Sequence, residues 1–226
     1  MIYPVFRIYY NKNMKTVTKI SLVLFLAAAL LLQTFTEAPA YASDKESAYK
    51  AYYALVKELH NSDEFSDGYD RFALIYVDDD DIPELLAVNT PRDEYDNNGI
   101  YIYELYTYYD GKAVMLGSYA SGVASAGGYR GDTMYIRKSG KLYETYYYSA
   151  SGDGEDIVYK LQDGELIETA RGKFNIADEE TAIWKDKTVS CADYSKKLNK
   201  VFKLKKAKSL EKITTVTYKK MRKKLK

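Results

Sequence analysis

The stretch IYIYELYTYYDGKAVMLGSY, residues 100–119, decides the fold. Aromatic and β-branched side chains fill its two arms, and Asp110-Gly111 separates the arms. Glycine adopts positive φ without steric cost, so an x-Gly pair between two β-rich arms is typical of a hairpin turn. The same scheme recurs around residues 139–140 and 163–164. Three hairpins in succession predict a β-meander, and therefore an antiparallel sheet.

Helical patterns flank this meander on both sides. The capping-box sequence SDKE at residues 43–46 predicts the start of a helix that ends near His60. Ser190 is placed to cap a second helix, while residues 210–226 are ambiguous between strand and helix. We therefore expect an α+β fold with an N-terminal helix, six to eight strands, and a C-terminal helix or helices packed on the sheet. A closed or propeller-like arrangement of the hairpins is the alternative.

The first 42 residues have the pattern of a cleavable secretory leader. Lysines precede the apolar run ISLVLFLAAALLL at residues 20–32, and Ala40-Tyr41-Ala42 fits the small-x-small cleavage rule. The apolar run is shorter than the ~20 residues of a membrane-spanning helix, which disfavours an uncleaved anchor. We expect cleavage after Ala42, with Met14 as an alternative start. The protein is then secreted, extracellular or cell-wall associated.

The remaining chain is long enough for one domain with its own core. We divide it into a single α+β domain, residues 43–202, and a basic C-terminal tail, residues 203–226, that we expect to be helical. Cys191 is the one cysteine of the chain, which excludes an internal disulfide framework. We expect Cys191 to be a small, half-buried apolar residue.

The net charge of +1 hides a strong asymmetry. Residues 43–195 contain 15 Lys and Arg against 30 Asp and Glu, whereas residues 196–226 contain 14 Lys and Arg and one acid, Glu211. Such a basic segment attracts an anionic polymer or membrane surface. The alternative is that it lies against its own acidic domain.

Tyrosine is unusually frequent, with 25 in the chain, and many fall in the predicted strands. Residues 146–148 are three tyrosines in a row. Successive strand residues point to opposite faces, so both faces of this strand carry rings. Cross-strand aromatic pairing in an ordinary sheet accounts for such rings. The alternative is a surface of exposed rings that stack on sugars or peptides.

Four adjacent aspartates separate the first two predicted strands. Calcium loops of the D-x-D-x-D-G type place alternate carboxylates on one side of a tight turn, with a glutamate from the following segment. The best register here places Asp78, Asp80 and Glu84 at ligand positions. Tyr76 then occupies the first ligand position, and Asp81 occupies the position that glycine usually takes. A plain acidic turn between two strands is the alternative to a calcium site.

The string FALIYVDDDDIPEL, residues 72–85, resembles a signature of uncharacterised exported proteins and lipoproteins of Gram-positive anaerobic bacteria. In many of them it reads as D-x-D-G-D-G-x-P-E-L. The segment WKDKTVS, residues 184–190, followed by a helix with Tyr194 and Leu198, is similar to their closing strand, turn and capped helix. The resemblance implies envelope localisation and bound Ca²⁺, and it implies no established activity.

These patterns favour a non-catalytic binding protein of the cell envelope or the extracellular space. Its expected partner is an anionic cell-wall polymer, a membrane surface, a glycan or another exported protein. Nucleic acid is disfavoured, because the basic tail lacks interleaved aromatic residues beyond Tyr218.

A secreted hydrolase that acts on cell-wall or glycan substrates through paired carboxylates is the alternative function. The sequence contains no H-E-x-x-H and no nucleophile elbow, so we assign no catalytic residue. The single histidine, His60, fits the last turn of the first helix, where a partial positive charge suits the helix dipole.

Overall fold

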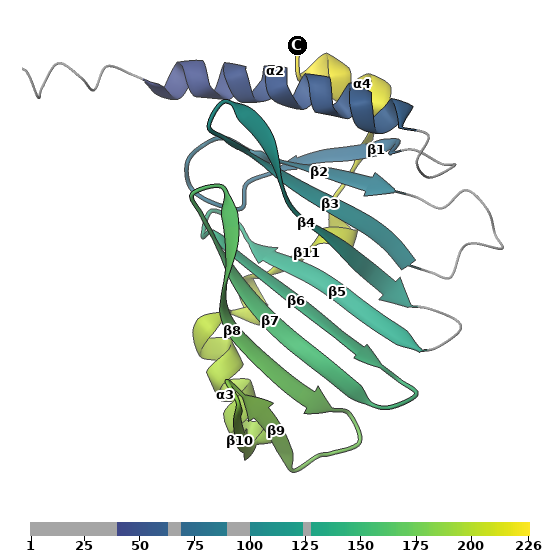
Figure 1. Ribbon diagram of the computed structural model, residues 1–226, viewed down its shortest axis with the longest axis vertical. Helices are drawn as coiled ribbons and strands as arrows, with labels where there is room; N and C mark the ends of the chain where they lie inside the picture. The colour runs from purple at the N-terminus through teal and green to yellow at the C-terminus, as the bar shows by residue number, and fades with distance from the viewer. Residues whose placement is uncertain (1–39, 63–68, 90–99, 124–127) are drawn as a thin grey trace, which may run out of the picture. The chain divides into compact units, whose positions relative to one another are not determined.

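The structure is a computed structural model, and it describes residues 40–62, 69–89, 100–123 and 128–226. Figure 1 shows the arrangement of its helices and strands. The helices are α2 (Ala40–Asn61), α3 (Cys191–Val201) and α4 (Tyr218–Lys224), with the 3₁₀ turns η1 (Leu204–Lys206) and η2 (Leu210–Lys212). The strands are β1 (Arg71–Ile75), β2 (Glu84–Asn89), β3 (Ile100–Tyr109), β4 (Lys112–Val123), β5 (Tyr129–Ile136), β6 (Lys141–Tyr148), β7 (Asp153–Gln162), β8 (Glu165–Asn175), β9 (Thr181–Trp184), β10 (Lys187–Ser190), β11 (Lys208–Ser209) and β12 (Val216–Thr217).

The strands form one antiparallel sheet, and the predicted α+β class is confirmed. Strands β10 to β1 follow one another in the sheet in reverse chain order, with β12 beside β1 and β11 beside β5. The described residues contain twelve strands, so the expectation of six to eight is too low. The strands missed by that count include β11 and β12, which have two residues each. Segments this short carry no alternation from which a strand can be predicted.

The predicted leader lies almost entirely outside the described residues, as does most of the loop predicted after α2. Among the described residues, no helix combines the length and the apolar character needed to cross a membrane.

Two of the three predicted hairpin turns share one backbone geometry. Asp110 and Gly111 have φ of 48° and 80°, and Asp163 and Gly164 have φ of 52° and 77°. Two successive residues with positive φ are the signature of a type I′ turn, whose twist matches the twist of the flanking strands. The third predicted turn, Ser139-Gly140, also joins two paired strands, β5 and β6. The hairpin prediction is therefore confirmed at all three places.

Helix α2 packs its apolar stripe on the first strands. Its fully buried Tyr52 and Val56 lie in one cluster with Phe72 of β1 and Leu85 of β2. The helix ends at Asn61 as expected, but it begins at Ala40, so the predicted start at Ser43 is wrong. Alanine is the best helix former, and the alanines before the SDKE sequence extend the helix by three residues.

Helix α3 begins where the sequence predicted. Ser190 is its N-cap, and the Ser190 hydroxyl accepts a hydrogen bond of 3.2 Å from the backbone N–H of Asp193. Tyr194 and Leu198 are buried against β7, β8 and β9. Cys191 is half-buried and free, as expected, and it donates a weak hydrogen bond to the Asp178 carbonyl at 3.7 Å.

The two long helices lie on the sheet face that is opposite to a shared inner core. On β2, Leu85 belongs to the cluster under α2, whereas Leu86 belongs to the inner core. On β6, Leu142 belongs to the inner core, whereas Tyr143 packs under α3. Neighbouring strand residues point to opposite faces, so the inner core occupies the face that α2 and α3 leave free. It joins residues from β1 to β7, which shows that the sheet curls.

The curl leaves most of the β5 edge unpaired by β4, and we call this gap between β4 and β5 the seam. The chain after α3 closes the seam. Strand β4 pairs with β5 through only two residues, Gly122 and Val123, and β11 continues along the same edge of β5. Strand β12 then pairs with the free edge of β1. Between them, Leu210 of η2 is fully buried in the inner core. Residues 203–226, predicted as a tail, thus belong to the same compact unit as the sheet.

The prediction that residues 203–226 are helical is wrong for most of that length. Only α4 is α-helical there, and it has seven residues. The remainder consists of the two 3₁₀ turns, two short strands and extended backbone. Tertiary pairing with β5 and β1 overrides the helix propensity of the lysines, because each pairing satisfies backbone groups on an open edge.

We expect Leu210→Ala to lower the free energy of unfolding by about 2–5 kcal/mol, because it opens a cavity in the inner core and loosens the seam. Urea denaturation followed by circular dichroism measures this change. Ile167→Ala is the matched control, since Ile167 is 47% exposed on β8, and we expect a change within about 0.5 kcal/mol. If both variants lowered the free energy of unfolding equally, Leu210 would not be the core residue that the structure shows.

Candidate functional site

The four aspartates after β1 form a tight turn that is braced by its own side chains. The Asp78 Oδ1 atom accepts a hydrogen bond from the Asp80 backbone N–H at 3.3 Å, and the Asp80 Oδ1 atom accepts one from the Ile82 N–H at 2.8 Å. Asp81 has a φ of 64°, in the left-handed region. The position that glycine takes in calcium loops is thus left-handed here, and an aspartate occupies it.

A second turn contacts the acidic turn and supplies the positive charge it needs. The Lys138 ammonium contacts Asp81 Oδ1 at 2.5 Å, and this contact lowers the pKa of Asp81. The backbone N–H of Lys138 donates to the Tyr76 carbonyl at 3.1 Å, and the N–H groups of Ser139 and Gly140 donate to the Val77 carbonyl at 2.8 Å. Sequence reasoning missed Lys138, because 57 residues separate it from Asp81 and no local signal links the two.

Glu84 is the most unusual carboxyl group of the turn, since only 1% of the residue is exposed. Its Oε2 atom accepts a hydrogen bond of 2.6 Å from the Val77 N–H, and its Oε1 atom has no hydrogen-bond partner among the described residues. Burial, together with the nearby Asp78 and Asp80, raises the pKa of Glu84 to about 8. At neutral pH this carboxyl group therefore holds its proton, which avoids a buried charge.

Tyr52 of α2 lies close to this carboxyl group and is itself fully buried. Burial raises the pKa of Tyr52, and the nearby carboxyl groups of Glu84, Asp80 and Asp78 add to the rise. Burial also raises the pKa of Asp78 to about 6, and the Asp80 carboxylate beside it adds to the rise. Partly buried polar groups of the acidic turn thus lie next to a buried hydroxyl of the first helix.

The structure brings the three predicted calcium ligands near one another without arranging them as a cage. Asp78 and Asp80 each direct one oxygen to a backbone amide of the turn, and Glu84 directs one to Val77. Over the described part of the chain, no group of three or more His, Cys, Asp or Glu residues is placed to hold a metal ion. Calcium binding by these three residues stays a prediction.

The other candidate site is the lysine surface, which we define as the 13 lysines of residues 196–226. All 13 are exposed. Among the described residues, Lys196 is the only one of them that forms an ion pair, with Asp193 at 3.5 Å. The segment belongs to the same compact unit as the acidic domain, yet 12 of its 13 lysines form no ion pair with the described residues.

Apolar and aromatic contacts hold the last part of this segment in place. Met221 and Leu225 are buried in the cluster under α2. The Arg222 guanidinium lies 4.9 Å from the ring centre of Tyr53 and donates to the Tyr53 hydroxyl. His60 occupies the last turn of α2, as expected, and its ring stacks on Tyr218 at 3.8 Å. The lysines of α4 are thus displayed from a fixed support.

No protein-family model, curated protein or solved structure matches this chain. The function is therefore argued from the geometry of these surfaces.

We expect the free energy of unfolding to fall as pH rises from about 6.5 to about 8, by at most about 1.4 kcal/mol per pH unit. The pKa of Glu84 is raised from 4.5 to about 8, so the folded protein holds a proton that the unfolded chain has already released. Glu84→Gln removes this fall, and Asp79→Asn, at an exposed aspartate of the same turn, retains it. Urea denaturation across this pH range measures how the free energy of unfolding of each variant changes with pH. Equal slopes for the two variants would refute the assignment of this pH dependence to Glu84.

The calcium prediction has its own test, a thermal melt at increasing calcium concentration. A bound ion raises the melting midpoint as its concentration increases, because only the folded state presents the ligands. Asp80→Asn should then abolish the rise. A midpoint that does not move at millimolar calcium, for the unmodified chain, would remove the prediction.

Proposed function

We propose that this chain is an exported, non-catalytic protein of the cell envelope that binds an anionic polymer of the envelope. The binding surface is the lysine surface of residues 196–226. One observation carries the proposal: these lysines are exposed and, apart from Lys196, have no ion pair with described residues. Exposed cations that form no ion pair with the described residues are available to an external anion.

The charge distribution supports a polymer over a small anion. Positive groups extend from α3 through η1 to α4, along the whole closing segment. The domain before this segment carries a net charge of −15, so it repels a polyanion and confines contact to the lysine surface. Because α3, β11, β12 and α4 are held by packing and pairing, binding does not have to order a free tail.

Deleting residues 203–226 is not a usable test, because the deletion removes Leu210 and both seam strands. Charge reversal at exposed positions leaves the fold in place. We expect Lys205→Glu with Lys206→Glu to lower the sodium chloride concentration at which the protein elutes from an immobilised glycerol-phosphate polymer. Screening weakens such contacts, so elution salt reports their strength.

Lys112→Glu with Lys187→Glu is the matched control. Both lysines are exposed, both lie outside residues 196–226, and the change in net charge is the same. We expect this control to elute much closer to the unmodified protein than the first variant does. If the two variants elute at the same salt concentration, net charge alone governs retention and the lysine surface is not the binding site.

A further inference from the structure

A straight row of side chains crosses five strands at the end of the sheet that is remote from the acidic turn. The register places Tyr146 of β6 opposite Glu155 of β7, Glu155 opposite Lys173 of β8, and Lys173 opposite Ile183 of β9. Ile183 in turn faces Thr188 of β10. Directly opposed residues share one face of a sheet, so this row forms a continuous strip.

The strip begins in a cluster of three tyrosines. The ring centres of Tyr129 and Tyr146 are 6.3 Å apart, and those of Tyr146 and Tyr148 are 6.1 Å apart in an edge-to-face arrangement. Tyr129 is fixed, because its hydroxyl donates to the Ala120 carbonyl at 2.8 Å. Tyr148 is 46% exposed, so its ring is open to a ligand. Such rings offer apolar area at little entropic cost.

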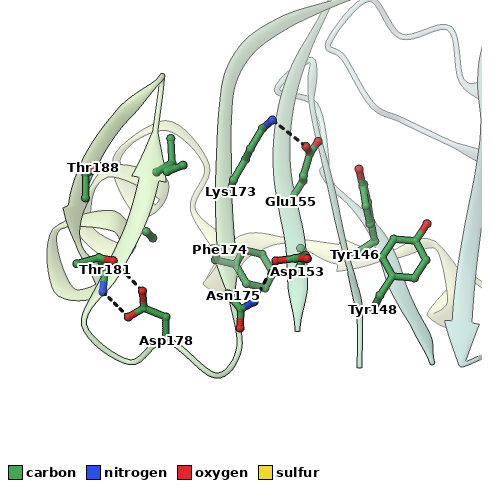
Figure 2. A pocket seen from close by; sticks show the side chains of 13 residues that line it. Tyr146, Tyr148, Asp153, Glu155, Lys173, Phe174, Asn175, Asp178, Thr181 and Thr188 are labelled. Carbon is green, nitrogen blue, oxygen red and sulfur yellow. Dashed lines mark hydrogen bonds and ion pairs between the residues drawn. The ribbon is translucent and has the colours of Figure 1, made fainter. Parts of the chain in front are cut away.

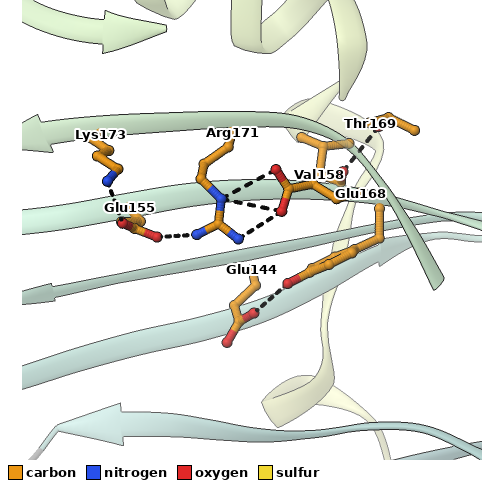
Figure 3. A network of polar contacts seen from close by, with 8 residues as sticks. Glu144, Glu155, Val158, Glu168, Thr169, Arg171 and Lys173 are labelled. Carbon is orange, nitrogen blue, oxygen red and sulfur yellow. Dashed lines mark hydrogen bonds and ion pairs between the residues drawn. The ribbon is translucent and has the colours of Figure 1, made fainter. Parts of the chain in front are cut away.

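The charges of the strip are paired with one another (Figure 3). Arg171 donates to Glu155 and to Glu168, the latter at 2.7 Å, and the Lys173 ammonium lies 3.5 Å from Glu155 Oε1. Separately, the Tyr159 hydroxyl donates to Glu144 at 3.2 Å. These ion pairs therefore hold the donors and acceptors of the strip in fixed positions.

A cavity of about 540 Å³ opens along this strip, within the usual range for ligand sites. Figure 2 shows Tyr146 and Tyr148 at one side and Thr181 and Thr188 at the other. Between them, Asn175 donates to the Asp153 carboxylate at 3.0 Å, which fixes both polar groups. An aromatic wall beside oriented amide, carboxylate and ammonium groups thus lines the cavity.

We propose that this cavity binds a neutral oligosaccharide. A pyranose ring has a face of C–H groups that packs on an aromatic ring, and a rim of hydroxyls that both donate and accept hydrogen bonds. Tyr148 and Tyr146 provide the packing surface, Asp153 and Lys173 provide partners for the rim, and Asn175 holds Asp153 in position. Three carboxylates (Asp153, Glu155 and Asp178) and one ammonium (Lys173) line the cavity, so it repels a polyanion, whereas an uncharged ligand meets no such repulsion.

This site is independent of the lysine surface. None of its lining residues belongs to residues 196–226, and its contacts do not depend on net charge. Binding at the cavity should therefore be insensitive to sodium chloride, whereas binding at the lysine surface should weaken with salt. The two proposals can fail separately.

The test is affinity electrophoresis and calorimetry of the full chain against soluble neutral hexasaccharides: cello-, xylo-, manno-, malto- and chito-oligosaccharides. We expect at least one to bind, with an affinity that salt leaves unchanged. Tyr148→Ala should weaken that binding about tenfold, the loss of one stacked ring. Tyr109→Ala is the control, since Tyr109 is also 46% exposed but lies at the β3–β4 turn, and it should bind as the unmodified chain does.

Failure to bind any of these five sugars would overturn the proposal. Equal losses of affinity for Tyr148→Ala and Tyr109→Ala would overturn it as well. Sedimentation of the same samples tests a competing occupant. If the unmodified chain dimerises and Tyr148→Ala is monomeric, the strip is an interface between two copies and not a sugar site. Asn175→Asp, which removes the donor to Asp153, should weaken sugar binding without unfolding the chain, because Asn175 lies at the end of β8.

Discussion

An unpaired strand edge exposes a row of backbone N–H and C=O groups, and a meander has such an edge at each end. Here the curl of the sheet adds a third exposed edge, where β5 diverges from β4. One segment near the C-terminus, β11 to β12, pairs with β5 and with β1 and inserts Leu210 between them. The inner core, the support of α4 and the display of the lysines all depend on this closure.

Local signals were enough to predict the parts of the fold that local chemistry determines. Asp110-Gly111 and Asp163-Gly164 form the I′ turns that their residue types favour, and Ser190 caps α3 as its hydroxyl allows. The seam could not be predicted in this way. Strands β11 and β12 are two residues long in a lysine-rich sequence, and they exist because distant edges require partners.

The same distinction between local chemistry and tertiary contacts applies to the candidate sites. The lysine surface could be predicted from composition, because a lysine side chain is exposed without any tertiary contact. The burial of Glu84 could not be predicted from composition, since it depends on α2 and on the turn that carries Lys138. The strip from Tyr146 to Ile183 draws one residue from each of four strands, and only the register brings them together. Sequence spacing alone does not contain that register.

The position of the seam in the chain has a consequence for how the protein is made. Synthesis proceeds from the N-terminus, and domains fold as their parts emerge. Here β1 is among the first strands to leave the ribosome, yet its partner β12 follows β2 to β11 in the chain. The nascent chain cannot complete its core until β12 has emerged. A chain that lacked β11 and β12 would present open edges on β1 and β5, so it would be readily degraded and would not reach the folded state.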